Sequence, residues 1–71
     1  MNKEIKINTE FIKLSSLLKL AGDVETGGES KNVIQLGLVS VNDKICKVNG
    51  KKIYENDVVK FGDCEYTVRT K

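Results

Sequence analysis

In the middle of this chain the spacing of apolar residues changes from helical to alternating, and the change falls at Gly37. Before Gly37, apolar residues recur every three or four positions, as Leu14 and Leu17 do, which is typical of a helix. After it, Val39 and Val41 alternate with polar residues, as on a half-buried strand. The sequence therefore predicts an α+β fold in which helices come early and strands late.

The first half predicts a short strand followed by a helix. The stretch KEIKI (3–7) alternates isoleucines with charged residues, which indicates a strand. The stretch FIKLSSLLKLAG (11–22) then places Leu14, Leu17, Leu18 and Ala21 at helical spacing and leaves Lys13 and Lys19 toward solvent. Gly22 is a natural stop for this helix.

A second helix is predicted from about Gly28 to Leu36. Thr26 and Glu29 have the spacing of a capping box, in which the threonine hydroxyl accepts a backbone N–H and the carboxylate reaches back. Gly37 stands where a helix commonly ends in a left-handed residue.

Three turn signals divide the second half into strands: Asn42-Asp43, Asn49-Gly50 and Gly62-Asp63. Asn49-Gly50 is the strongest hairpin signal, because both residues tolerate positive φ. The stretches DVVKF (57–61) and CEYTVRT (64–70) form the last predicted hairpin. The expected architecture is two short helices packed on a small antiparallel sheet of four to five strands.

Length and composition favour a single domain over residues 1–71. The start MNKEIKINTE has no apolar signal region, and no later stretch is long enough to span a bilayer, so we expect a cytoplasmic protein without a membrane partner. Cys46 and Cys64 lack the histidines or further cysteines of a zinc site. Two reduced, half-buried thiols are therefore expected rather than a disulfide or a reactive thiol.

The residues that enzymes need are missing or scattered. The chain has no histidine, and its serines have no evident activating partner. Gly27-Gly28 before a helix exposes backbone N–H groups, but the strand and the Gly-Lys-Ser/Thr ending of a P-loop are absent. We therefore predict no enzyme, no cofactor, no metal and no small-molecule substrate, although these N–H groups remain able to contact a nucleic-acid phosphate.

Lysines form the most suggestive group. Lys44, Lys47, Lys51 and Lys52 occupy a stretch without any acid, and the two turns around them would bring them to one edge. If Lys31 on the second helix faces the same edge, the result is a cationic groove suited to phosphates. The alternative is a solvated face, which is the commoner fate of such a cluster.

Taken together, these segments resemble the S4 RNA-binding domain, and more closely the small stand-alone bacterial S4 proteins of the YaaA/YbcJ type. S4 domains typically show a Ser-Arg-x-Glu-Ala-like helix start, then Gly-x-Val-x-Val-Asn-Gly, then Gly-Asp-x-Val. Thr26, Glu29 and Ser30 match the first motif, residues 37–42 the second and residues 57–59 the third. The resemblance covers nearly the whole chain.

The chain also departs from the S4 pattern. Gly27 stands where many S4 domains have arginine, although Gly-Gly is typical of the stand-alone subgroup. Asp43 replaces the glycine of the Val-Asn-Gly turn and puts an acid beside the expected RNA edge, and Asn56 replaces another glycine. The basic residues after the turn are lysines, which lack the bidentate fork of arginine, so we expect weaker binding than in arginine-rich relatives.

The resemblance implies an S4-like (αL) fold and a monomeric protein that binds structured RNA, such as ribosomal or transfer RNA, with the ribosome as a partner. The residues expected to contact RNA, of which Lys31 is the strongest candidate, are Lys13, Lys19, Gly27, Gly28, Lys31, Gln35, Asn42, Lys44, Lys47, Lys51 and Lys52.

Recognition is expected to be mainly by shape, because A-form RNA hides its base edges in a deep groove. The scarcity of exposed aromatic candidates argues against a platform that stacks single-stranded bases. The alternative function is a protein-interaction adaptor that keeps the fold and docks a partner through the sheet or an edge strand, with the acidic stretch Glu55–Glu65 as a possible contact. A salt titration of RNA binding separates the two functions.

Overall fold

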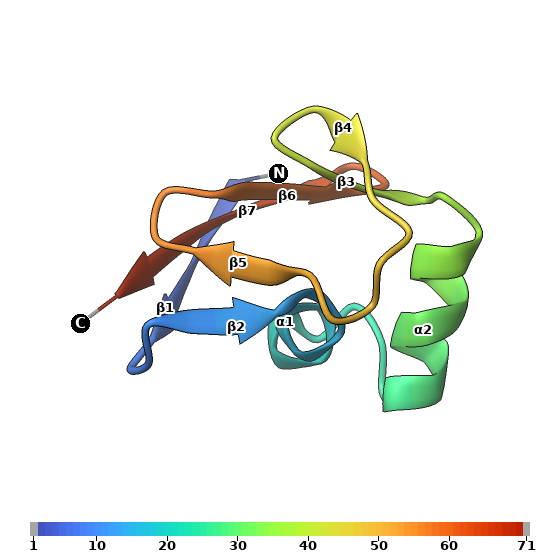
Figure 1. Cartoon of the computed structure of the whole chain (residues 1–71), viewed down its shortest axis with the longest axis horizontal. Helices are drawn as coiled ribbons and strands as arrows, with labels where there is room; N and C mark the ends of the chain where they lie inside the picture. Colours follow the sequence, from blue (N-terminus) through green and yellow to red (C-terminus); the bar gives the residue numbers. More distant parts are fainter. Residues whose placement is uncertain (1, 71) are drawn as a thin grey trace.

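The computed structural model describes residues 2–70, which form two helices and seven strands (Figure 1). In chain order these are β1 (Asn2–Ile7), β2 (Phe11–Lys13), α1 (Leu14–Ala21), α2 (Gly27–Gln35), β3 (Val39–Val41), β4 (Lys44–Ile45), β5 (Lys52–Tyr54), β6 (Val58–Phe61) and β7 (Cys64–Thr70). The predicted α+β class is confirmed. No helix within residues 2–70 has the length and apolar character needed to cross a membrane.

Five strands form one sheet in the order β1-β7-β6-β3-β4, and β2 and β5 form a separate two-stranded ribbon. The predicted β6–β7 hairpin is confirmed, with Phe61 opposite Cys64 at the turn. The sheet is mixed rather than wholly antiparallel, because β1 runs parallel to β7. A parallel pair of strands needs a long connection. Here nearly the whole chain lies between β1 and β7, so the pairing could not be predicted from a local sequence pattern.

Helix α1 begins three residues later than the start of the predicted helical stretch, because 11–13 forms β2. No side chain caps α1. Its first N–H groups instead donate to carbonyls of a distant turn, Leu14 N to Lys51 O at 2.9 Å and Ser15 N to Asn49 O at 3.2 Å. These long-range bonds satisfy groups that a helix start otherwise leaves unpaired, and they fix where α1 begins.

The Asn49-Gly50 hairpin prediction is wrong. A turn does form, with Lys51 N donating to Val48 O at 3.2 Å. The flanking strands do not pair with each other, however: β4 pairs with β3, and β5 pairs with β2. The turn therefore connects the five-stranded sheet to the ribbon, and its carbonyls cap α1.

Helix α2 closely follows its prediction. The Thr26 hydroxyl accepts the N–H of Glu29 at 3.1 Å, as expected. The Glu29 carboxylate accepts from Glu25 N at 3.3 Å, one residue earlier than a strict capping box requires. The predicted stops also hold, since Gly22 and Gly37 have φ values of 86° and 76°.

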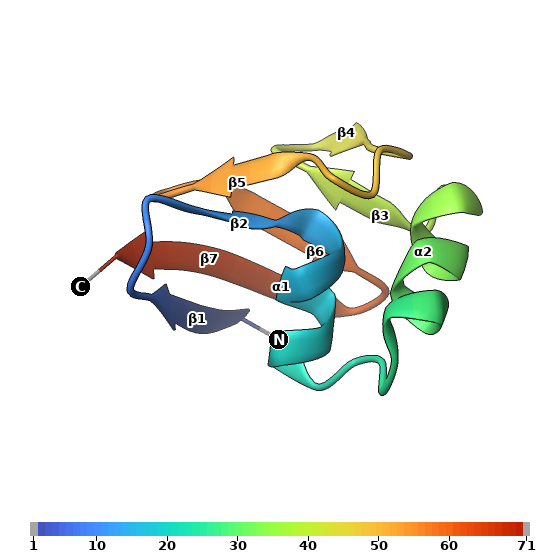
Figure 2. The same cartoon turned by 60° about the horizontal axis from the view of Figure 1, so that its bottom comes forward.

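The core lies where the helices meet the strands, with α1 and α2 side by side (Figure 2). Ser30 is buried at the helix crossing and donates to Ser15 O at 3.0 Å. Tyr66 is buried on β7, and its hydroxyl donates to the Asp23 carboxylate in the α1–α2 connection. Burial, with this hydrogen bond, raises the pKa of Tyr66 well above its usual value, so the phenol stays neutral.

The two cysteines are free thiols, and both are half-buried, as expected.

Candidate nucleic-acid interface

A shallow groove of about 630 Å³ runs along β4 and the segment that leads to β5. Three of the predicted lysines line it, Lys44, Lys47 and Lys51, and Ile45 and Val48 supply an apolar floor. The three lysines and both apolar residues are solvent-exposed. The groove therefore offers positive charge beside apolar surface.

A tight turn positions the first of these lysines. Asn42 and Asp43 both have positive φ, 51° and 71°, and join β3 to β4 as predicted. The Asn42 side chain donates to Asp57 Oδ1 at 3.1 Å and accepts from Val58 N at 2.9 Å. Its amide therefore ties the turn to β6, and Asn42, which was expected to contact RNA, is engaged within the protein.

The sequence did not indicate that Asp57 is the hydrogen-bond partner of the Asn42 side chain. Its second carboxylate oxygen accepts from Tyr54 N at 2.8 Å, so one side chain joins the end of β5 to the β3–β4 turn. The only sequence signal was the joint presence of an Asn and an Asp in two separate S4-like motifs. Asp57 belongs to the acidic stretch Glu55–Glu65 of the alternative adaptor function, but its carboxylate is occupied by these hydrogen bonds within the protein.

Asp43, the acid expected beside the basic edge, is paired. Its carboxylate lies 2.9 Å from Lys60 Nζ on β6. The hydrogen bond and the charge of Asp43 raise the pKa of Lys60. The pair is solvent-exposed and adds little stability, but it offsets the negative charge next to Lys44.

One end of α2 is hydrogen-bonded to a residue of the groove. Gly28, Lys31 and Gln35 recur at helical spacing and are all exposed. Gln35 Nε2 donates to Lys47 O at 3.1 Å, which fixes the C-terminal end of this face against the groove. The C-terminal end of α2 therefore lies beside the lysine-rich segment, and Lys31 lies one turn earlier on the helix.

Gly37 allows this close approach. A Cβ at Gly37 would lie 3.2 Å from Lys47 Cε and 3.6 Å from Ile45 Cγ2, and its φ of 76° also disfavours other residues. The Lys47 stem therefore lies close to Gly37, where a Cβ would push it slightly aside.

Gly27 and Gly28, by contrast, have no internal reason to be glycine. Neither has positive φ. A Cβ at Gly27 would meet nothing within 4 Å, and one at Gly28 would reach only the Thr26 hydroxyl at 3.8 Å. Glycine destabilises a helix relative to alanine, so the bare surface at the start of α2 calls for an explanation outside the isolated chain.

Two further predicted lysines lie beyond the groove, on the β2–β5 ribbon. Lys51 lines the groove, Lys52 follows it on β5, and Lys13 lies opposite Lys52 in the β2–β5 register. Lys19 does not line the groove, because it lies on α1 beside Ile12 and Leu20. The structure thus brings Lys44, Lys47 and Lys51 together in the groove and pairs Lys13 with Lys52 on the ribbon.

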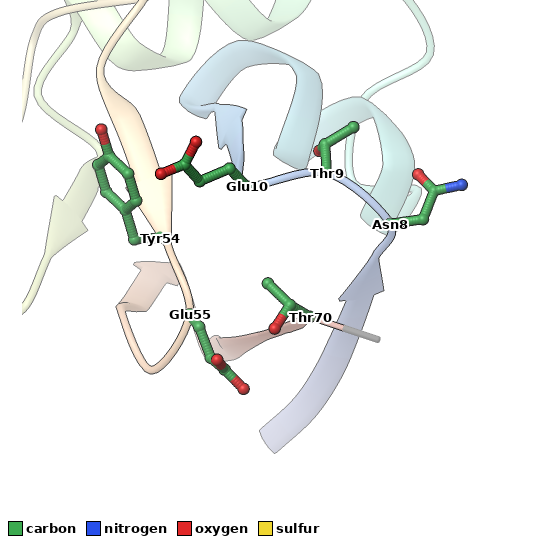
Figure 3. Close-up of a pocket in the computed structure, with 6 residues that line it drawn as sticks. All are labelled: Asn8, Thr9, Glu10, Tyr54, Glu55 and Thr70. Carbon is green, nitrogen blue, oxygen red and sulfur yellow. The ribbon is translucent and has the colours of Figure 1, made fainter.

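The opposite end of the ribbon has the reverse charge. A concavity there is lined by Asn8, Thr9, Glu10, Tyr54, Glu55 and Thr70 (Figure 3). Two acidic residues, Glu10 and Glu55, and no lysine line it, so this end of the ribbon is unfavourable for an anion. Within residues 2–70, no three His, Cys, Asp or Glu side chains gather where they could hold a metal ion.

Comparison with known proteins identifies a family and a similar protein. Residues 5–69 match the S4 domain family. A protein of Bacillus subtilis (strain 168) named "Probable ribosome maturation protein RlbA" is 40% identical over 61 residues, which cover 86% of each chain.

Proposed function

The chain belongs to the S4 domain family, and from this membership we propose that it is a non-catalytic, monomeric RNA-binding protein that takes part in ribosome maturation in the cytoplasm. The similar B. subtilis protein is named for ribosome maturation, which makes ribosomal RNA the preferred partner and transfer RNA the second candidate.

The observation that carries the proposal is the continuity of the basic surface. Lys44, Lys47 and Lys51 line one groove, and the Gln35–Lys47 hydrogen bond attaches the Lys31 face of α2 to it. Lysines on phosphates release counterions and supply most of the affinity of a protein for nucleic acid. A surface of this kind fits the backbone of folded RNA.

In the proposed mechanism the RNA backbone crosses the start of α2, where Gly27 and Gly28 leave the helix surface bare. The exposed N–H groups of that first turn face one phosphate. Lys31 and the groove lysines then hold neighbouring phosphates. Lysine contacts carry little sequence information, so the RNA is recognised by its shape.

Charge reversal tests the surface directly. The double variant Lys31→Glu/Lys44→Glu is expected to bind ribosomal RNA more weakly and to show a shallower salt dependence, by about 0.9 in the logarithmic slope for each phosphate that is no longer neutralised. The matched control is Lys3→Glu/Lys6→Glu, which changes the charge equally on β1 at the opposite edge of the sheet. Filter binding across a salt series measures both variants.

Equal loss of affinity in the two variants would mean that only net charge matters, and an unchanged Lys31→Glu/Lys44→Glu variant would remove the proposed surface. The adaptor alternative makes a different prediction: no binding to ribosomal or transfer RNA even at low salt.

A further inference from the structure

The outer face of the β2–β5 ribbon carries two aromatic and two basic side chains. Phe11 lies opposite Tyr54 in the register and Lys13 opposite Lys52. Cross-strand partners share a face, and side chains two residues apart on a strand do so too. All four therefore lie on one side, while Ile53 between them is buried on the other.

The aromatic pair is held in a fixed arrangement. The ring centroids of Phe11 and Tyr54 are 5.8 Å apart and the rings are tilted by 47°. Lys52 Nζ lies 4.9 Å from the Phe11 centroid and covers that ring. Tyr54 is 44% exposed, and its backbone N–H is held by Asp57. The Tyr54 ring thus packs against Phe11 and stays partly open to solvent among residues 2–70.

The charges around Tyr54 define what would fit. The Glu10 carboxylate points toward the Tyr54 ring, whereas that of Glu55 points away (Figure 3). Lys13 lies at the other end of the same face, and Lys52, opposite it in the register, extends so that its ammonium lies over the Phe11 ring. A phosphate is repelled at the Tyr54 end and attracted at the lysine end, so a flat neutral group joined to a phosphate suits both ends.

We propose that this face binds one unpaired nucleobase of the RNA, stacked on Tyr54, with the adjoining phosphates on Lys13 and Lys52. The inference rests on the proposed function and deepens it, because it adds an unpaired nucleotide to the structured RNA. It also revises the expectation that the chain has no aromatic platform. Phe11 and Tyr54 are far apart in the sequence, and only the β2–β5 pairing joins them.

Two RNA probes test the inference: a blunt duplex, and the same duplex with one bulged 2-aminopurine, whose fluorescence falls when it stacks. Tyr54→Leu is expected to weaken binding of the bulged probe roughly 5- to 150-fold, the equivalent of ~1–3 kcal/mol for one stacked base, and to abolish the quenching. Binding of the blunt probe is expected to stay unchanged. Tyr54→Phe keeps the aromatic ring and should still bind the bulged probe more tightly than the blunt one.

Leu38→Ala is the matched control, because Leu38 is similarly exposed, at 52%, and lies outside the ribbon. It should leave both probes unaffected, and circular dichroism verifies that each variant is folded. If the wild type binds both probes equally, the stacking site is overturned, while lysine-dependent binding of the blunt duplex would still support RNA binding.

Absence of any binding at low salt would overturn both proposals together. A Tyr54→Leu variant that keeps both RNA affinities but loses binding to RNA-free ribosomal proteins would assign the face to a protein and overturn the inference.

Discussion

At the scale of single residues, the most informative pair is Asn42 and Asp57. Each comes from a different S4-like motif, and together they bind the β3–β4 turn to β6 and to the end of β5. The asparagine is suited to this position because its backbone is left-handed, with φ 51°. Folding alone therefore gives a reason for an asparagine in this motif, because its hydrogen bonds fix the turn that leads to Lys44.

This role predicts different outcomes for two substitutions. Asn42→Gly keeps the backbone conformation and loses two hydrogen bonds of about 0.5–1.5 kcal/mol each, so the free energy of unfolding should fall by about 1–3 kcal/mol. Asn42→Ala should cost about 1 kcal/mol more, because alanine disfavours positive φ. Urea denaturation measures both. Folded Asn42→Gly should bind RNA as the wild type does; reduced affinity with intact stability would show that the amide contacts RNA.

At the scale of elements, helix α2 combines a strong cap with a weak first turn. Thr26 and Glu29 fix its start, yet Gly27 and Gly28 reduce its intrinsic stability. The same bare surface is what a close approach of RNA would require. A methyl group added at this surface should therefore raise the free energy of unfolding and lower the affinity for RNA.

Gly28→Ala is expected to raise the free energy of unfolding by up to about 1 kcal/mol and to weaken RNA binding, because its Cβ would occupy the surface that the backbone crosses. Ser16→Ala is the control, since Ser16 is exposed on α1 rather than on α2 and the substitution also favours helix. It should leave RNA affinity unchanged. Tighter or unchanged binding by Gly28→Ala would mean that RNA does not cross this turn.

Elements set by neighbours in the sequence were predictable, and those set by distant partners were not. The α2 cap, the Asn42-Asp43 turn and the β6–β7 hairpin depend on a few adjacent residues. Strand β2 looked helical because its partner, β5, lies far along the chain. The lysine groove was foreseen from charge spacing, whereas the Phe11–Tyr54 face depends on that same long-range pairing.

At the scale of the whole molecule, the size of the hydrophobic core limits the stability of the fold. A domain of 71 residues rarely gains more than about 3–5 kcal/mol from a single core. Strand β1 contributes Ile7, only 6% exposed, to that core from the edge opposite the groove. Folding of the basic surface thus depends on packing at the far side of the sheet.

Ile7→Ala should cost about 2–5 kcal/mol through loss of buried surface and the cavity left behind, which lowers the Tm by at least about 8 °C. Ile45→Ala, at a side chain that is 68% exposed, should change the Tm little.

A ligand that binds only the folded chain restores stability by mass action, about 2.7 kcal/mol at a concentration one hundred times its Kd. Ribosomal RNA at that level should therefore raise the Tm of Ile7→Ala by about 11–22 °C. Adding Lys31→Glu and Lys44→Glu to the same variant should abolish this recovery without further loss of stability in the absence of RNA, because both lysines are exposed. Recovery that survives the charge reversal would place RNA on a different surface. The measurement is a thermal melt of both variants with and without RNA.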